Sequence, residues 1–282
     1  MLSYEKHVLK GSDYYTYTPS LLAKDIFFYP LFVGYFYYSS DYTLCRDSYD
    51  SFLILYVKKG HCYITVDQTE YFVEQSQTIL IDCYKPHSYR SDMNWEAEWI
   101  HFDGSLARSY YELIRETSGI VIYVKDLYAF EKSLHKVYTM FANAVSVKES
   151  LLNKYITDLL TYLLLSTDDR EKQVINANII EEISVYINEH LADPLSLNDL
   201  ASKASLSPFY FTRLFKKQTG LTPHDYIISA RINFSKFLLK TTELSIKEIC
   251  YNSGFSNESS FCFTFKKREG VTPSDYRKRD FG

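Results

Sequence analysis

Two stretches in the last third of the chain repeat the same order of residues. The first runs from Leu195 to Tyr226 and the second from Leu244 to Tyr276. Both begin with Leu-Ser and an apolar residue, and both end with Phe-Lys-Lys, Gly, Thr-Pro and Asp-Tyr. The offset is 49 residues at the front and 50 at the back, so the second copy has one extra residue. Such internal repetition means that one supersecondary unit is used twice.

Each copy predicts a helix, a tight turn and a second helix. Ser196 and Ser245 are suitable N-caps for the first helices, with an acid three residues later in each copy. Gly254 suits the tight turn of the second copy. Ser207 then caps the second helix of the first copy, and Ser256 or Asn257 caps its equivalent. The pattern therefore indicates two helix-turn-helix units, at about 195–218 and 244–269, which bind double-stranded DNA through their second helices.

The second helix of each unit has an apolar face and a mixed face. Phe211 and Phe215 should point inward in the first unit, as should Phe261 and Phe265 in the second. The residues expected to face DNA are then Phe209, Thr212, Arg213, Lys216, Asn257, Ser259, Cys262, Phe263 and Lys266. An arginine such as Arg213 can bind guanine in a bidentate manner, worth about 1–3 kcal/mol of discrimination.

The aromatic residues Phe209 and Phe263 on this expected face have two interpretations. Contact with thymine methyl groups in the major groove would explain them. Packing against a neighbouring helix of the same chain is the alternative, and the sequence leaves both open.

A long helix is predicted to join the two units. Thr222 caps it, Pro223 takes its first position, and it continues to about Lys240. About 18 residues at a rise of 1.5 Å span about 27 Å. This length would hold the second helices of the two units, which are the ones expected to enter the major groove, about 34 Å apart on one side of the duplex. That distance is one turn of DNA.

The charge of the chain is divided unevenly. From Leu195 onward there are 14 Lys and Arg against 8 Asp and Glu, whereas residues 1–194 have 17 against 27. A basic region on an acidic protein suits a polyanionic partner. The first residues are polar and no run of 18 apolar residues occurs, so we expect a cytoplasmic protein without a membrane partner. The five cysteines form no CxxC pair, which favours free thiols.

Residues from about 20 to 104 predict an antiparallel β-sandwich or barrel. Short apolar or alternating runs follow one another at a spacing of about ten residues, with turns between them. The predicted strands include Phe52–Val57, His61–Val66, Tyr71–Val73, Thr78–Ile81 and Trp95–Phe102. Trp95 and Trp99 would share one strand face with His101.

The periodicity becomes helical after Gly104. One helix begins near Leu106, and two more are expected at about 127–143 and 149–165. The last one has an apolar stripe from Leu151 to Leu164 that is wider than one packed face needs. Packing within the domain and contact with a partner chain both remain open for this stripe.

The DNA-binding units resemble those of the AraC family of transcription regulators. The resemblance is carried by residues 230–277, which include Ala230-Arg231-Ile232, Gly254-Phe255, Phe265-Lys266-Lys267 and Thr272-Pro273, and with the first unit it covers about 190–279. One departure is Phe263, which stands where the family commonly has Arg. We therefore expect weaker guanine readout from the second unit.

The first half of the chain is similar to the sugar-sensing branch of this family. The similarity rests on Tyr56 to Gly60, Pro86 to Tyr89 and Trp99 to Gly104. It implies a cupin-type barrel that encloses a small-molecule effector, followed by helices that form a homodimer. It also implies an activator of carbohydrate uptake or catabolism genes that works with RNA polymerase. Arg46, Tyr89 and Trp99 match positions that line the family's sugar pocket.

The complete set of expected effector-binding residues is Arg46, His87, Tyr89, Trp95 and Trp99. A sugar site needs aromatic faces and hydrogen-bonding groups, which these residues supply. The alternative for each is a purely structural role in the barrel core.

The predicted fold class is therefore α+β and multidomain, with an antiparallel barrel and following helices before an all-α region. The effector-binding and dimerisation domain spans 1–168, with the barrel at about 20–104 and the helices at about 105–168. A linker at 169–176 precedes the DNA-binding domain at 177–282.

Metal and enzyme chemistry lack sequence support. His61 and His87 have no second His two residues away, so the usual metal cluster of cupins is not expected, and neither is a cofactor. No GxSxG, HExxH or P-loop motif occurs, and no catalytic residue is predicted. Two alternatives remain at this point, a regulator with a non-sugar effector such as a fatty acid, and a cupin enzyme with a helical interaction module.

Overall fold

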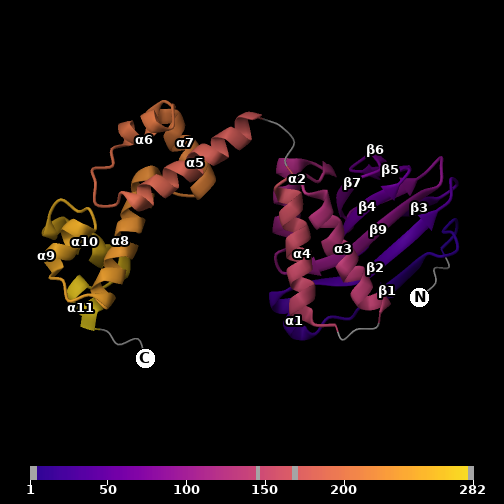
Figure 1. Cartoon of the computed structure of the whole chain (residues 1–282), viewed down its shortest axis with the longest axis horizontal. Helices are drawn as coiled ribbons and strands as arrows, with labels where there is room; N and C mark the ends of the chain where they lie inside the picture. The colour runs from indigo at the N-terminus through magenta and orange to yellow at the C-terminus, as the bar shows by residue number, and fades with distance from the viewer. Residues whose placement is uncertain (1–4, 144–146, 167–170, 279–282) are drawn as a thin grey trace. The chain divides into compact units, whose positions relative to one another are not determined.

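The chain forms two compact units, Met1–Asp168 and Asp169–Gly282 (Figure 1). The computed structural model describes residues 5–143, 147–166 and 171–278, of which 171–178 are described by backbone alone. Residues 169 and 170 of the predicted linker lie outside this range, and the rest of that linker already belongs to a helix that begins at Glu171. No helix within the described residues is long and apolar enough to cross a membrane.

Two antiparallel sheets build the first unit. The larger has the strand order β1-β2-β9-β4-β7-β10 and the smaller β3-β8-β5-β6. The strands are β1 Asp13–Thr16, β2 Phe28–Tyr38, β3 Thr43–Arg46, β4 Phe52–Lys59, β5 His61–Val66, β6 Thr69–Glu74, β7 Gln77–Asp82, β8 His87–Arg90, β9 Trp95–Gly104 and β10 Val121–Tyr123. The prediction of an antiparallel β domain is thus confirmed, although β1, β2, β3, β8 and β10 were not among the strands predicted individually.

The alternation of side chains along β9 supplies two different cores. Trp95, Ala97 and Trp99 point between the two sheets, where they meet residues of β5 and β8. Ile100 and Phe102 point to the opposite face of the larger sheet. Because successive residues of a strand face opposite sides, one strand can serve both cores.

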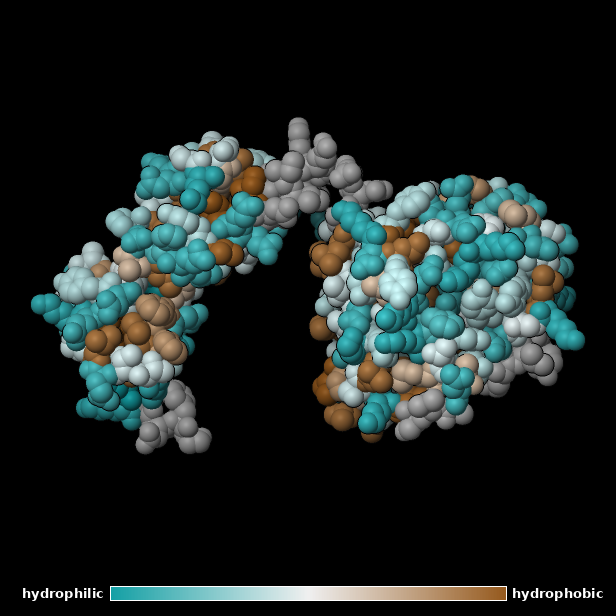
Figure 2. All heavy atoms as spheres, in the orientation of Figure 1, coloured by the Kyte–Doolittle hydropathy of each residue, from teal (hydrophilic) through white to brown (hydrophobic). Residues whose placement is uncertain are grey.

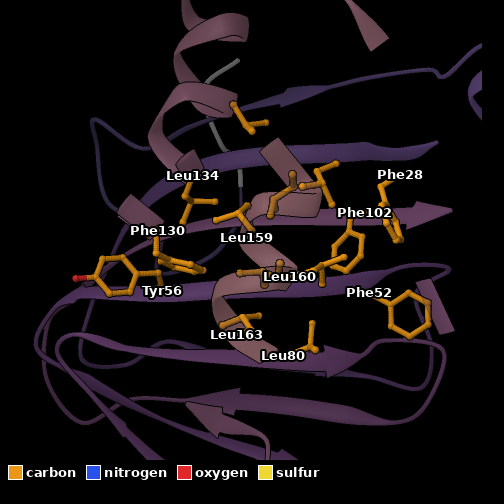
Figure 3. Close-up of a cluster of buried hydrophobic side chains, with 14 of the residues drawn as sticks. Phe28, Phe52, Tyr56, Leu80, Phe102, Phe130, Leu134, Leu159, Leu160 and Leu163 are labelled. Carbon is orange, nitrogen blue, oxygen red and sulfur yellow. The ribbon is translucent and has the colours of Figure 1, made fainter. Parts of the chain in front are cut away.

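Helices cover the outer face of the larger sheet (Figure 3). They are α1 Leu21–Ile26, α2 Ala107–Ser118, α3 Leu127–Ala142 and α4 Glu149–Leu164. In Figure 3, Phe130 and Leu134 of α3 lie over the sheet beside Leu159, Leu160 and Leu163 of α4. The apolar stripe of α4 is therefore largely accounted for by packing within its own unit.

The second unit is helical. Its helices are α5 Glu171–Glu189, α6 Leu197–Lys203, α7 Pro208–Thr219, α8 Pro223–Thr241, α9 Ile246–Asn252, α10 Glu258–Glu269 and α11 Pro273–Lys278. Two small cores lie along α8, one around Phe211 and Phe215 and one around Phe261 and Phe265. One helix thus carries both copies of the repeat.

The helix caps agree closely with the sequence prediction. Ser196 accepts a hydrogen bond from the backbone of Asp199, and Ser245 with Glu248 forms a complete capping box. Of the two candidates for the cap of α10, the structure uses Asn257. Leu197 has the helical spacing of the buried Leu200 and Ala201, but it is 42% exposed at the start of α6.

The tight turn has the same geometry in both copies. Gly254 has φ +81°, and Ser205, its counterpart 49 residues earlier, has φ +55°. In both copies the next amide closes the turn, Leu206 onto the Ala201 carbonyl at 2.9 Å and Phe255 onto the Cys250 carbonyl at 3.0 Å. A glycine is thus not required by the left-handed conformation alone, since the first copy uses a serine.

Candidate functional site

The second helices of the two units, α7 and α10, pack in the same way. Phe211 and Phe215 are fully buried, and so are Phe261 and Phe265. The rings of Phe215 and Tyr226 meet edge to face at 5.3 Å, and those of Phe265 and Tyr276 at 5.5 Å. Each helix therefore presents its opposite side to solvent, as the repeat predicted.

On α7 the exposed side combines aromatic and basic groups. Phe209 is 81% exposed, and Arg213 and Lys216 are also exposed. Arg213 has no ion pair within the described structure, and its guanidinium lies 5.5 Å from the Tyr210 ring centre. Thr212 is half-buried and donates its hydroxyl to the Pro208 carbonyl at 2.8 Å. The hydroxyl hydrogen of Thr212 is thus already used in a hydrogen bond within the helix.

On α10 the expected residues divide into two groups. Phe263 is 71% exposed, and Ser259 and Lys266 are exposed beside it. Asn257 instead uses its side-chain oxygen to accept from the Ser260 amide at 2.8 Å, as the helix cap. Cys262 is half-buried and packs against the core of its own unit, because it follows the inward-facing Phe261. Figure 2 shows apolar and polar atoms side by side at the end of the unit formed by α9, α10 and α11.

Two further exposed lysines belong to this surface, and the sequence analysis did not predict them as DNA-binding residues. Lys217 and Lys267 occupy equivalent places in the last turns of α7 and α10. The repeated Phe-Lys-Lys motif contained the signal, since both of its lysines are exposed in both copies. Neither pair of lysines is engaged in an ion pair in the described part of the unit.

A groove of about 980 Å³ lies between the two copies. Residues of α8 and α10 line it together with the 192–195 loop, and Phe263 and Lys267 are among them. Arg231 of α8 also lines the groove, where it donates to the carbonyls of Leu191 at 3.0 Å and Asp193 at 2.8 Å. Partial burial lowers the pKa of this guanidinium. Arg231 thus has a structural role, which is to tie α8 to the loop between α5 and α6.

A second candidate site is a cavity of about 350 Å³ between the two sheets of the first unit. Aromatic side chains dominate its walls. The lining residues are Glu5, Tyr14, Phe32, Phe36, Tyr38, Tyr42, Leu44, Arg46, Tyr49, Leu53, Leu55, Tyr89, Trp95, Trp99 and His101. Four of the five expected effector-binding residues are brought together here.

The fifth, His87, does not line this cavity. It is buried at the start of β8, its Nδ1 is 2.8 Å from the Lys85 carbonyl, and its ring meets that of Tyr89 edge to face. Burial lowers the pKa of His87. Its contact with a ligand is therefore not supported by the geometry, because Tyr89 stands beside it on the cavity wall.

Several polar groups of the cavity lack a hydrogen-bond partner. The Tyr89 hydroxyl and the indole nitrogens of Trp95 and Trp99 are buried without a hydrogen-bond partner in the described structure. Arg46 is half-buried and lacks an ion pair among the same residues, and its guanidinium lies 4.8 Å from the Tyr49 ring centre. Buried polar groups normally have partners, so these groups indicate that a ligand or water fills the cavity.

Trp95 offers less of its ring surface to the cavity than Trp99 does. Its ring stacks on Tyr38 at 4.1 Å and 11°, so one aromatic face is already covered. Its side chain can offer mainly the indole N–H. Trp99, by contrast, meets Phe36 and His101 edge to face.

His101 also lines the cavity, on the same face of β9 as Trp99, although the sequence did not predict it as an effector-binding residue. Burial, with smaller effects of Arg46 and His87, lowers the pKa of His101 to about 3. The ring is therefore neutral at ordinary pH. Its Nδ1 lies 2.8 Å from the Ser51 hydroxyl, a contact that no local pattern indicated. This pair fixes the orientation of a neutral hydrogen-bonding ring on the wall.

No group of three or more His, Cys, Asp or Glu that could hold a metal ion occurs among the residues that the structure describes.

Both regions match known protein families. Residues 200–279 match a helix-turn-helix domain, and residues 29–158 match the AraC-like ligand binding domain. The Msm operon regulatory protein of Streptococcus mutans is 27% identical over 242 residues, which is 81% of this chain and 84% of that protein. The regulatory protein SoxS of Escherichia coli is 35% identical over 101 residues, which is 36% of this chain and 94% of that protein.

Among solved structures, one similar chain is the C-terminal domain of the two-component response regulator yesN from Fusobacterium nucleatum. It is 38% identical, covers 36% of this chain and 98% of its own, and gives a TM-score of 0.35.

Proposed function

This chain belongs to the AraC family of DNA-binding transcription regulators, and we propose that it is a cytoplasmic, homodimeric activator that responds to a sugar. Its ligand-binding domain would hold the effector, and its two helix-turn-helix units would read two successive major-groove segments. The regulated genes would serve carbohydrate uptake or catabolism. In this proposal the effector-binding domain is 1–168 and the DNA-binding domain is 177–282.

The DNA contacts that we propose centre on α7. The single observation that carries this assignment is the exposed pair of Phe209 and Arg213 on the side of α7 away from the core. Arg213 would donate to guanine, and Phe209 would contact a thymine methyl group. Lys216, Lys217, Lys266 and Lys267 would neutralise phosphates. Phe263 and Ser259 would supply the weaker base contacts of α10.

Binding measurements at different salt concentrations test the phosphate contacts. A DNA site would first be selected from a random library with the full chain. The logarithm of affinity should then fall linearly with the logarithm of salt concentration, with a slope of about −0.9 for each neutralised phosphate. An affinity that does not change with salt concentration would contradict phosphate neutralisation by these lysines.

The sugar effector is supported by the chemistry of the cavity. Aromatic walls suit the C–H faces of a sugar ring, and the walls also hold several hydrogen-bond donors without partners. Arg46 can donate to hydroxyl oxygens, and Glu5 can accept, as it already does from Tyr42 at 2.6 Å. A cavity of about 350 Å³ is of the size that small ligands occupy.

A thermal-shift panel tests this part directly. Pentoses, hexoses, disaccharides and a fatty acid would be added separately to the full chain. A ligand at 100 times its dissociation constant stabilises the folded state by about 2.7 kcal/mol, which is a measurable rise in Tm. If only the fatty acid raises the Tm, the effector is an apolar molecule and not a sugar.

The dimer and the polymerase contact are further parts of the proposal. The helices of the first unit would form the dimer, through those α4 residues that its own core leaves half-buried, such as Leu151, Tyr155 and Leu164. Sedimentation equilibrium of the full chain should give twice the mass of 33.1 kDa. In vitro transcription with purified RNA polymerase should rise when the effector is added, and a fall would make the protein a repressor.

A further inference from the structure

Gly34 and Trp99 face each other across β2 and β9. A Cβ atom at position 34 would lie 2.3 Å from Cζ2 of Trp99, 2.7 Å from Cε2 and 2.8 Å from Cη2. All three atoms belong to the indole ring, so the ring lies directly on the glycine backbone. The φ of Gly34 is outside the left-handed region. The position therefore requires the absence of a side chain and not the conformational freedom of glycine.

The other sides of the Trp99 indole are also occupied. Phe36 meets it edge to face with ring centres 5.0 Å apart, and His101 does so at 5.6 Å. On the far side of β9, Leu55 is its cross-strand neighbour. Phe36, Leu55 and His101 all line the cavity with Trp99. Close-packed neighbours leave a displaced ring only one direction, which is into the cavity.

We propose that Gly34 is a specificity-determining residue of the effector cavity, because it lets the Trp99 indole rest on β2 and thereby sets the depth of the cavity. This inference rests on the proposed function, in which the cavity holds the effector. With any side chain at position 34, the closest distance must rise from 2.3 Å to the 3.4 Å of ordinary contact, so the ring moves inward by about 1 Å. The unpartnered indole N–H of Trp99 moves with it and is misplaced for a ligand.

The first test needs no ligand. The chain has two tryptophans, so the Trp95→Phe variant has Trp99 as its only indole fluorophore. Adding Gly34→Ala to this variant should change the emission maximum and the acrylamide quenching of Trp99. Identical emission and quenching with and without Gly34→Ala would overturn the inference.

The second test measures selectivity with two probes, D-galactose as a hexose and D-xylose as a pentose. Isothermal calorimetry would compare the wild-type chain with Gly34→Ala. The affinity for the larger sugar should fall about tenfold or more, because overpacking a close-packed wall misplaces its contacts. The affinity for the smaller sugar should fall less, so the ratio of the two affinities changes. An unchanged ratio with full hexose affinity would contradict the proposal.

A rescue variant separates the cavity from general destabilisation. Trp99→Phe in the Gly34→Ala background replaces the indole with a smaller ring and should restore stability, including the case in which Gly34→Ala alone does not fold. A double variant that remains unfolded would overturn the inference. If no sugar of the thermal-shift panel binds the wild-type chain, the sugar proposal fails, while the fluorescence of Trp99 still decides the role of Gly34.

Discussion

Arg231 donates its Nε–H to the carbonyl oxygen of Leu191 at 3.0 Å, which ties the middle of α8 to the loop between α5 and α6. A second bond from the same guanidinium reaches the carbonyl of Asp193 at 2.8 Å. Gly254, in the turn of the second helix-turn-helix unit, lies against both partners of the first bond. Three segments that are distant in sequence thus meet at one point within the helical unit, between the two helix-turn-helix units.

Replacement of Gly254 by Ala should break this junction. The new Cβ would lie 1.9 Å from the Leu191 oxygen and 2.7 Å from Nε of Arg231. We expect the free energy of unfolding to fall by more than the strain of a left-handed alanine explains. Overpacking should add about 1–3 kcal/mol to that loss. Chemical unfolding of the full chain, followed by circular dichroism, measures it.

Gly220 and Gly270 provide matched controls for this substitution. Both have a similar positive φ, +76° and +77°, but a Cβ at either position would meet nothing within 4 Å. Gly220→Ala and Gly270→Ala should therefore show only the backbone strain. Equal losses for all three variants would mean that the contact with Arg231 contributes nothing.

Arg213→Ala and Lys216→Ala should weaken DNA binding in different ways. The loss of Arg213 should cost about 1–3 kcal/mol on the selected site and much less on random DNA, because a base contact is removed. The loss of Lys216 should weaken both equally and reduce the salt slope by about one. Fluorescence anisotropy with both DNAs gives the four affinities.

The distinction between the two variants is itself the control. If Arg213→Ala loses the same amount on random DNA as on the selected site, its role is electrostatic and the base-reading assignment is wrong.

The buried His101 predicts a dependence of stability on pH. Its pKa in the folded chain, about 3, lies below the ordinary value of 6.5. As the pH falls below 6.5, the unfolded chain binds this proton and the folded chain does not, so stability is lost. Between pH 7 and pH 5 the wild-type chain should lose about 2 kcal/mol more than a His101→Gln variant. Urea unfolding at both pH values measures the difference, and parallel losses would contradict the neutral buried ring.

The helical half of the fold was well predicted because its signals are local. The capping box of Ser245 and the cap of Thr222 are set by residues three positions away, which the sequence shows directly. The repeat also gave each prediction twice, since Phe215 and Phe265 occupy equivalent buried positions in the two copies. The turn at Ser205 was less visible, because a left-handed serine has no characteristic pattern.

The cavity was harder to predict because it depends on contacts across strands. Trp99 could be assigned from strand alternation, but the register that places Gly34 beneath it is set by the pairing of β2 with β9. The contact of Ser51 with His101 likewise joins residues that are 50 positions apart. Short strands such as β3 carry too few residues to show a period, so the surroundings of Arg46 were not predicted.

In the proposed complex, one chain holds two DNA-reading units at a fixed distance along one face of the duplex. This arrangement is tested by inserting five base pairs between the two halves of the selected site, which turns the second half to the opposite face. The affinity of the full chain should then fall to the level of a site with one half destroyed. A ten-base-pair insertion should not restore it, because α8, a helix of 19 residues, cannot lengthen to span another turn. Unchanged affinity after the five-base-pair insertion would mean that the two units do not read one face of the duplex at a fixed distance.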